Sequence, residues 1–219
     1  MFWRMFHVGE SATYICKGVT MDSKEGDVFP RLQKKLEFIE NPDLAHLDCL
    51  VPVHPLIVTV PEPHSNDEVV KCYVRMPLYV STANDLPLPC TESLVLDIAS
   101  RVYNALGLMW SISVYHCDVK PSNIFLDTAG VARLGDFGSV SDVINDGCNT
   151  TLPYVPSDIR PVAGRQLDAG MLLCTVAALL RWYMPLDGGR ISITIIKEKL
   201  SVLCNEVLVS LVNNLLEIK

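Results

Sequence analysis

The sequence YHCDVKPSNIFLD occupies residues 115–127, and the shorter sequence LGDFG follows at residues 134–138. The first stretch contains five chemically distinct residues at a set spacing: His116, Asp118, Lys120, Pro121 and Asn123. At roughly one in twenty for each residue type, this combination should recur by chance only about once in a few million windows. We expect Pro121 to prevent a helix from continuing there, which keeps the loop open. Gly138 is expected to allow a sharp backbone turn after Asp136.

These two stretches resemble the catalytic loop and the magnesium-binding Asp-Phe-Gly turn of eukaryotic-type protein kinases. Cys117 stands where the family signature has the arginine of His-Arg-Asp. The resemblance implies an α+β, two-lobed protein-kinase-like fold over residues 1–219. It places a small β-rich N-lobe at residues 1–80 and a mostly helical C-lobe at residues 81–219.

The kinase resemblance also implies ATP and Mg²⁺ as cofactors and gives roles to four side chains. Asp118 would accept or orient the proton of the substrate hydroxyl, and Lys120 would reach the γ-phosphate as a compact cation. Asn123 and Asp136 would be the metal ligands, because their oxygens are the hard ligands that Mg²⁺ prefers. Lys120, Asn123 and Asp136 would therefore also contact the nucleotide.

Residues 8–18 lie where the glycine-rich loop over the phosphates is expected. Only Gly9 and Gly18 remain there, and the resemblance assigns Gly9 to nucleotide binding. No lysine stands in a clear Val-Ala-Ile-Lys pattern. Arg31 lies at the expected place of that strand lysine, with Lys24, Lys34 and Lys35 as alternatives.

Residues 31–41 predict a helix ended by an Asn-Pro pair, and Glu37 on it matches the ion-pair glutamate of the family. A surface glutamate is the alternative interpretation of Glu37. Residues 50–60 and 69–74 are rich in β-branched side chains and predict two strands separated by a loop.

The sequence VRMPLY at residues 74–79 resembles the interlobe hinge of kinases, where backbone groups recognise adenine. In this register Met76 lies at the back of the adenine pocket. Pro77 offers its carbonyl, and Tyr79 offers both its carbonyl and its N–H.

Residues 91–109 carry apolar side chains at helical spacing and predict a helix capped by Thr91 or Ser93. A second apolar run, residues 169–180, is too short to span a bilayer and predicts a buried helix that begins at Asp168. Asp168 resembles the aspartate that anchors the backbone of the catalytic loop in kinases. Trp110 is expected in the core.

Residues 151–158 resemble the Thr-Pro-x-Tyr-x-Ala-Pro-Glu sequence that closes the activation segment of kinases. The resemblance implies that Thr151 hydrogen-bonds Asp118 and Lys120, an arrangement of serine/threonine kinases. Asp158 replaces the glutamate of Ala-Pro-Glu. Residues 207–219 resemble the helix that precedes the family's Asp-Pro-x-x-Arg motif, so Asp158 is expected to lack its arginine partner. The C-lobe is expected to be truncated before its last helix.

Composition narrows the classes of function and of environment. Of the 219 residues, 49% are hydrophobic, which supports a large core, and the net charge of −7 argues against nucleic acid as a partner. The eight cysteines are Cys16, Cys49, Cys72, Cys90, Cys117, Cys148, Cys174 and Cys204. None are in Cys-x-x-Cys spacing, so they predict reduced thiols in a cytoplasmic or nuclear protein. No signal peptide or membrane span is expected.

Two hypotheses on function follow. The first is an active serine/threonine protein kinase that transfers the γ-phosphate of ATP to a protein substrate, because the four chemical residues of the loop and turn are present. The second is a pseudokinase, a binding or scaffolding module with weak or no turnover, because the glycine-rich loop is eroded and the strand lysine is missing. A small-molecule kinase on the same fold is less favoured, since residues 151–158 resemble a platform for protein substrates.

Overall fold

The computed structural model describes residues 2–6, 13–19, 48–61, 68–145, 147–183 and 189–218. The chain divides into two units, Met1–Leu78 and Tyr79–Lys219, which we call the N-terminal and C-terminal units. Several residues assigned from the sequence lie outside the described residues: Gly9, Lys24, Arg31, Lys34, Lys35 and Glu37.

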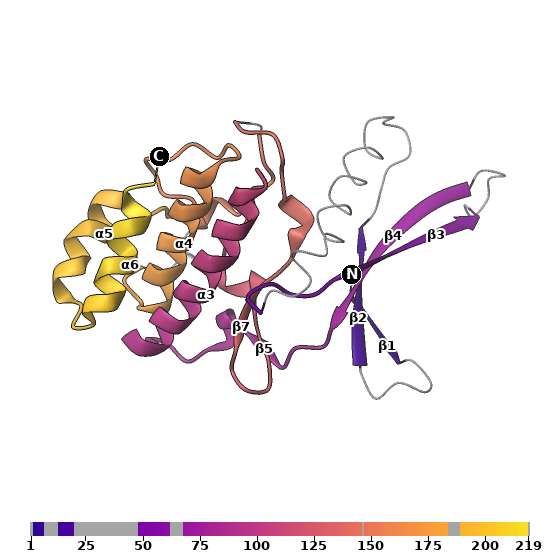
Figure 1. Ribbon diagram of the computed structural model, residues 1–219, viewed down its shortest axis with the longest axis horizontal. Coiled ribbons are helices and arrows are strands. Elements are labelled where there is room, and N and C mark those ends of the chain that lie inside the picture. The colour runs from indigo at the N-terminus through magenta and orange to yellow at the C-terminus, as the bar shows by residue number, and fades with distance from the viewer. Residues whose placement is uncertain are drawn as a thin grey trace. The chain divides into compact units, whose positions relative to one another are not determined.

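The N-terminal unit contains an antiparallel sheet of four strands (Figure 1). These are β1 (Phe2–Phe6), β2 (Thr13–Val19), β3 (His54–Pro61) and β4 (Glu68–Pro77), in the order β1-β2-β4-β3. Strands β3 and β4 confirm the two strands predicted from β-branched residues. Two prolines, Pro55 and Pro61, lie on β3, an edge strand of this sheet, where a missing backbone donor is tolerated.

A smaller antiparallel sheet in the C-terminal unit joins the two motif stretches. It consists of β5 (Ser81–Thr82), β6 (Ile124–Leu126) and β7 (Ala132–Leu134). In the turn between β6 and β7, the Asp127 carboxylate accepts hydrogen bonds of 2.9 Å from the backbone N–H groups of Ala129 and Val131. Gly130 has φ 78°, a left-handed conformation that suits glycine. The hairpin therefore holds the end of one motif beside the start of the other.

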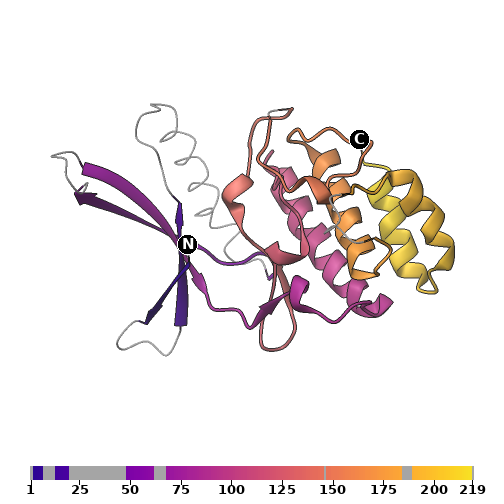
Figure 2. The ribbon, with the colours of Figure 1, turned by 180° about the vertical axis from the view of Figure 1, so that it is seen from behind.

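The described part of the C-terminal unit contains four α-helices. They are α3 (Glu92–Ser111), α4 (Arg165–Leu179), α5 (Ile193–Lys199) and α6 (Glu206–Leu216). The hydroxyl of Thr91 caps α3 by accepting the N–H of Leu94 at 3.4 Å, which confirms one of the two predicted caps. Helices α3, α4 and α6 pack against one another and lie side by side in both views (Figures 1 and 2).

Helix α4 forms the centre of the core. Every residue from Leu167 to Leu179 is buried, as predicted for the apolar run. The helix begins at Arg165 rather than at Asp168. Its first two residues, Arg165 and Gln166, are polar and exposed, so an apolar pattern does not mark them. Among the described helices, none is both long and apolar enough to cross a lipid bilayer.

Pro121 behaves differently from the expectation. It begins a short 3₁₀ turn, Pro121–Asn123, instead of only preventing helical structure. A proline is favourable at the first position of such a turn, because its fixed φ is already helical and its missing N–H has no partner to lose. The turn directs Asn123 back towards the loop that precedes it.

Candidate active site

A buried carboxylate from α4 anchors the backbone of the catalytic loop. Asp168 is fully buried; its Oδ2 accepts the N–H of His116 at 2.9 Å, and its Oδ1 accepts the N–H of Cys117 at 2.8 Å. The Nε1–H of Trp110, near the end of α3, donates to the same Oδ2 at 3.0 Å. The predicted anchoring contact is thus confirmed. The part of Trp110 in it was missed, because a tryptophan at helical spacing gives only a core signal.

His116 links the loop to the residue before Asp136. Its Nε2 lies 3.0 Å from the carbonyl oxygen of Gly135, and its Nδ1 accepts the N–H of Asp118 at 3.3 Å. One neutral tautomer satisfies both bonds, with the proton on Nε2. Complete burial lowers the pKa of His116 below its ordinary value, so the ring stays neutral. Its edge also packs on Phe137, with ring centroids 5.8 Å apart.

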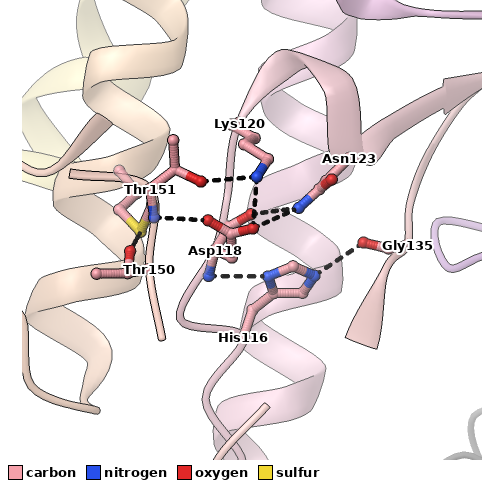
Figure 3. Close-up of polar contacts among 8 residues, drawn as sticks. His116, Asp118, Lys120, Asn123, Gly135, Thr150 and Thr151 are labelled. Carbon is pink, nitrogen blue, oxygen red and sulfur yellow. Dashed lines mark hydrogen bonds and ion pairs between the residues drawn. The ribbon is translucent and has the colours of Figure 1, made fainter. Parts of the chain in front are cut away.

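Three donor groups converge on the carboxylate of Asp118 (Figure 3). Lys120 Nζ lies 2.7 Å from Oδ2 and 2.6 Å from the hydroxyl of Thr151. Asn123 Nδ2 donates to the same Oδ2 at 3.0 Å and to the Asp118 carbonyl at 2.8 Å. The N–H of Thr151 donates to Oδ1 at 2.9 Å. These bonds confirm the predicted contacts of Thr151 with Asp118 and Lys120.

This network sets the charge of Asp118. Burial raises the pKa of the carboxyl, but the hydrogen bonds from Lys120 and Thr151 and the charge of Lys120 outweigh burial, and the pKa lies below its ordinary value. Asp118 is therefore ionised at neutral pH. An ionised carboxylate acts only as a hydrogen-bond acceptor, which suits it to hold the hydrogen of a hydroxyl group.

Asp136 stands in a left-handed backbone conformation, with φ 60° and ψ 67°. The sharp turn predicted at Gly138 therefore occurs at Asp136 itself. Gly138 has another role, because a Cβ there would meet Oδ1 of Asp136 at 3.3 Å, closer than an ordinary contact. The glycine leaves room for the carboxylate. Asp136 begins the 3₁₀ turn Phe137–Ser139.

Asn123 and Asp136 have the donor chemistry of a magnesium site. The N–H of Gly135 donates to the carbonyl of Asn123 at 2.9 Å, which holds Asp136 at the base of the same hairpin as Asn123. Because the amide nitrogen of Asn123 donates to Asp118, its amide oxygen remains to coordinate a cation. Within the described residues no group of three or more His, Cys, Asp or Glu side chains could hold a metal. The pair fits Mg²⁺, which needs few protein ligands when phosphates and water supply the others.

The residues assigned to the hinge lie in two different units. Met76 is buried at the end of β4 and faces Ile15 of β2 in the strand register, with Pro77 facing Tyr14. Tyr79 belongs to the C-terminal unit, where its ring lies 5.4 Å from that of Phe125. Their contact with adenine stays a prediction.

The activation segment is held to the rest of the C-terminal unit at several points. Tyr115 and Ser141 exchange two backbone hydrogen bonds, of 2.8 and 3.0 Å. The N–H of Asn145 donates to the carbonyl of Ala163 at 2.8 Å, and the hydroxyl of Thr150 donates to the sulfur of Met171 at 3.3 Å. These contacts dock the segment against the rest of the C-terminal unit.

Asp158 accepts a backbone hydrogen bond that the sequence did not predict. Its two oxygens lie 3.1 and 3.3 Å from the backbone nitrogen of Ile193, at the start of α5. Arg190 holds the neighbouring backbone: Nε donates to the carbonyl of Val155 at 2.9 Å, and Nη2 donates to those of Pro156 and Ile159 at 2.6 and 3.1 Å. Sequence reasoning missed Arg190, because a single arginine after two glycines forms no motif.

Known proteins with similar sequences are kinases. The chain is 29% identical over 101 residues to a probable serine/threonine-protein kinase of Dictyostelium discoideum, covering 43% of this chain and 16% of the relative. It is 26% identical over 147 residues to the serine/threonine-protein kinase ENV7 of Saccharomyces cerevisiae, covering 58% of this chain and 39% of the relative. It is 29% identical over 82 residues to the proto-oncogene serine/threonine-protein kinase mos of Rattus norvegicus, covering 36% and 24%. The chain thus matches well under half the length of each of these relatives.

The fold and the family agree with the motifs. The structure of the kinase PK-1 of Cydia pomonella granulovirus matches with a TM-score of 0.67 and 14% identity, over 98% of this chain and 84% of that one. This likeness shows the two-lobed kinase fold, with a small sheet and a mostly helical part. The family model described as the protein kinase domain matches residues 54–199, more than half of the chain. Such domains use ATP and act on proteins. With the Asp118 network and the Asp-Phe-Gly turn inside the matched region, the chain belongs to the eukaryotic-type protein kinase domain family.

Proposed function

We propose that the chain transfers the γ-phosphate of ATP, in the presence of Mg²⁺, to serine and threonine hydroxyls of protein substrates. The observation that carries this proposal is the network in which Lys120, Asn123 and Thr151 converge on Asp118. The relatives named above are serine/threonine kinases. Both support the same reaction class.

In this proposal Asp118 holds the substrate hydroxyl. The carboxylate is ionised and accepts the hydrogen of the hydroxyl, which points the oxygen at the phosphorus atom. Its lowered pKa makes it a weak base, so its main contribution is orientation, and it takes the proton as the new O–P bond forms. A positioned acid–base group contributes about 10²–10⁴-fold to a rate.

Lys120 supplies positive charge beside that carboxylate. Its ammonium group lies between Asp118 and the hydroxyl of Thr151, so its position is fixed from two sides. An ammonium group stabilises the negative charge that spreads over the phosphoryl oxygens in the transition state. Thr151 supports the serine/threonine class, because its hydroxyl and N–H complete the shell around Lys120 and Asp118.

Asn123 and Asp136 would hold the metal ion through their side-chain oxygens. When bound, Mg²⁺ neutralises charge on the phosphates. Asn123 has a second task, because its Nδ2–H orients Asp118 from the other side. Gly138 keeps the space that the Asp136 carboxylate needs.

The test is calorimetry of ATP binding with and without Mg²⁺, together with a transfer assay with γ-labelled ATP and casein as the probe substrate. Asp118→Asn should lower turnover by about 10²–10⁴-fold and leave ATP affinity nearly unchanged, because Asp118 acts in the transition state. Asp97→Asn, an exposed aspartate of α3, is the matched control and should retain full turnover. Equal turnover of Asp118→Asn and the native sequence would contradict the assignment.

Asp136→Asn tests the metal. It removes the charged ligand, so Mg²⁺ should no longer increase the affinity for ATP. The same calorimetric titration, repeated with EDTA, gives the metal-free value for comparison. If Mg²⁺ still tightens ATP binding in this variant, Asp136 is not the metal ligand.

The second candidate function is a pseudokinase that binds partners with weak or no turnover. The sequence features that favour it are the two remaining glycines, Gly9 and Gly18, and the missing lysine of a Val-Ala-Ile-Lys pattern. Calorimetry separates the two functions. Absence of ATP binding in the native sequence, with or without Mg²⁺, would favour the pseudokinase.

We also propose that the protein works in the cytoplasm or the nucleus. The support is the scattered cysteines without disulfide or metal spacing. In the described part of the chain, Cys90, Cys117 and Cys174 are buried free thiols. Fractionation of cells that express a tagged chain would test the compartment, and a secreted product would contradict it.

A further inference from the structure

Cys117 occupies a distinctive place in the catalytic loop. Its side chain is fully buried, its backbone is left-handed with φ 64°, and its N–H is held by Asp168 at 2.8 Å. The thiol donates to the carbonyl of Tyr115 at 3.6 Å. The sulfur is therefore fixed on the inner side of the loop, between Tyr115 and Asp118.

The activation segment meets the loop on both sides of this cysteine. Ser141 pairs with Tyr115 through two backbone bonds, and Thr151 donates its N–H to Asp118 at 2.9 Å. The chain from Ser141 to Thr151 thus begins beside Tyr115 and ends beside Asp118, and Cys117 lies between these two loop residues. Cys148 lies within that span.

The two thiols are neighbours. The Cys148 side chain lies close enough to Cys117 to raise the pKa of its thiol, and the Cys148 thiol donates to the carbonyl of Pro161 at 3.6 Å. Cys148 is half-buried, and its neighbour Gly147 is exposed and bridges to Val162. A small oxidant can therefore reach Cys148 first, because the Cys117 side chain is fully buried.

We propose that Cys117 and Cys148 are an oxidation site, at which a low-molecular-weight disulfide such as oxidised glutathione links the catalytic loop covalently to the activation segment. The site stands on the contacts above and goes beyond the proposed phosphoryl transfer. It lies where the family signature has an arginine that pairs with a phosphorylated residue. A covalent link would take the place of that ion pair.

The chemistry proceeds by thiol–disulfide exchange. The Cys148 thiolate attacks one sulfur of oxidised glutathione, its S–S bond breaks, and one glutathione thiolate leaves. Cys117 then attacks the Cys148 sulfur and passes its proton to the second glutathione thiolate, which leaves. Two electrons and two protons pass from the two cysteines, and two reduced glutathione molecules form. Burial and the neighbouring Asp168 carboxylate raise the pKa of Cys117 strongly, so Cys148 is the first thiolate.

The test uses the full chain, fully reduced and then incubated with oxidised glutathione. Free thiols are alkylated under denaturing conditions, the chain is digested, and the peptides are identified by mass spectrometry. We expect a cross-linked pair that contains Cys117 and Cys148, lighter by two hydrogens than the two reduced peptides and reversed by dithiothreitol. Cys204→Ser, at an exposed cysteine outside the pair, should retain this cross-link.

Cys148→Ser is the decisive variant, because serine is close in size and position 148 is only half-buried. It should abolish the cross-link and leave Cys117 alkylated. A second measurement is limited proteolysis within residues 141–151, which oxidation should slow in the native sequence and leave unchanged in Cys148→Ser. The proposal is wrong if Cys148 carries only glutathione, or if either cysteine pairs with another one. Neither readout needs kinase activity, so failure of the proposed function would leave this result intact.

Discussion

The catalytic loop, residues 115–123, and the activation segment, residues 139–159, are both largely irregular but are held in opposite ways. In the loop, His116, Cys117 and Asp118 are at most 8% exposed. A carboxylate of the core helix binds the N–H groups of His116 and Cys117. In the segment, Ile144 is 62% and Leu152 53% exposed. Its anchors are backbone bonds of Ser141 and Asn145, contacts of Thr150 and Thr151, and Arg190.

This difference assigns rigidity to one region and adjustability to the other. A buried carboxylate with three N–H donors leaves no inexpensive alternative arrangement, because each donor would lose its partner away from water. Replacing a backbone hydrogen bond at the surface by hydrogen bonds to water costs only about 1 kcal/mol. Asp118 and Lys120 thus lie on the stiff region, and the half-buried Cys148 lies on the other.

The largest expected effect comes from removing the carboxylate of the stiff region. Asp168→Ala leaves the N–H groups of Trp110, His116 and Cys117 buried without an acceptor, and should lower the free energy of unfolding by about 3–5 kcal/mol. Asp158→Ala, which also loses a backbone acceptor but at an exposed position, should cost less than about 1 kcal/mol. Urea denaturation measures both. Similar losses in the two variants would break the comparison.

Lowering the pH should destabilise the stiff region through His116. Burial lowers its folded pKa, so between its unfolded pKa of about 6.5 and the folded value the unfolded chain binds the extra proton. Stability should therefore fall as pH decreases from 7 to 5, by at most about 1.4 kcal/mol per pH unit from this residue. Unfolding curves of His116→Gln should show a flatter dependence on pH. Parallel curves for the two proteins would contradict a neutral, buried His116.

Arg190 tests the adjustable region. Arg190→Ala removes three bonds to backbone carbonyls at the surface, and we expect a loss of about 1 kcal/mol in unfolding free energy with faster proteolysis within residues 150–160. Arg190→Lys should recover only part, since an ammonium lacks the planar fork of donors. Arg160→Ala, an exposed arginine, is the control. Equal proteolysis of the native sequence and the three variants would show that Arg190 does not anchor the segment.

The smallest expected effect concerns phosphorylation, and it rests on the proposed activity. Cys117 has neither the charge nor the donors to bind a phosphate on Ser139, Ser141, Thr150 or Thr151. The segment is already docked through Ser141, Asn145 and Thr151. Phosphatase treatment should therefore leave phosphoryl transfer unchanged. A large loss on dephosphorylation would mean that another basic residue, with Arg133 as a candidate, performs the role of the missing arginine.

The sequence alone predicted the features that depend on local pattern. Helical spacing with Thr91 or Ser93 as a cap predicted α3, β-branched runs predicted β3 and β4, and the apolar run predicted the buried α4. The motif around Asp118 predicted the contacts of Thr151, because a family resemblance carries long-range information that a propensity does not.

Most of the missed features depend on contacts between residues far apart in the chain. Trp110 reaches Asp168 across 58 positions, and Arg190 reaches Val155 across 35. No periodicity marks such pairs. The contact of Cys117 with Cys148 has no motif either, since the two cysteines have no diagnostic spacing. The left-handed backbone of Asp136 was assigned to the wrong residue, because glycine is the usual indicator of a turn.

The hairpin between β6 and β7 has a practical use in protein engineering. Its base is closed by the bond from Gly135 to Asn123, while Thr128, Ala129 and Gly130 at its tip are exposed. Extra residues inserted at the tip would lengthen a solvated loop without moving its closed base. A short tag or a fluorophore at Ala129 would therefore sit on the same hairpin as Asn123 and Asp136 and report on their surroundings while leaving both untouched.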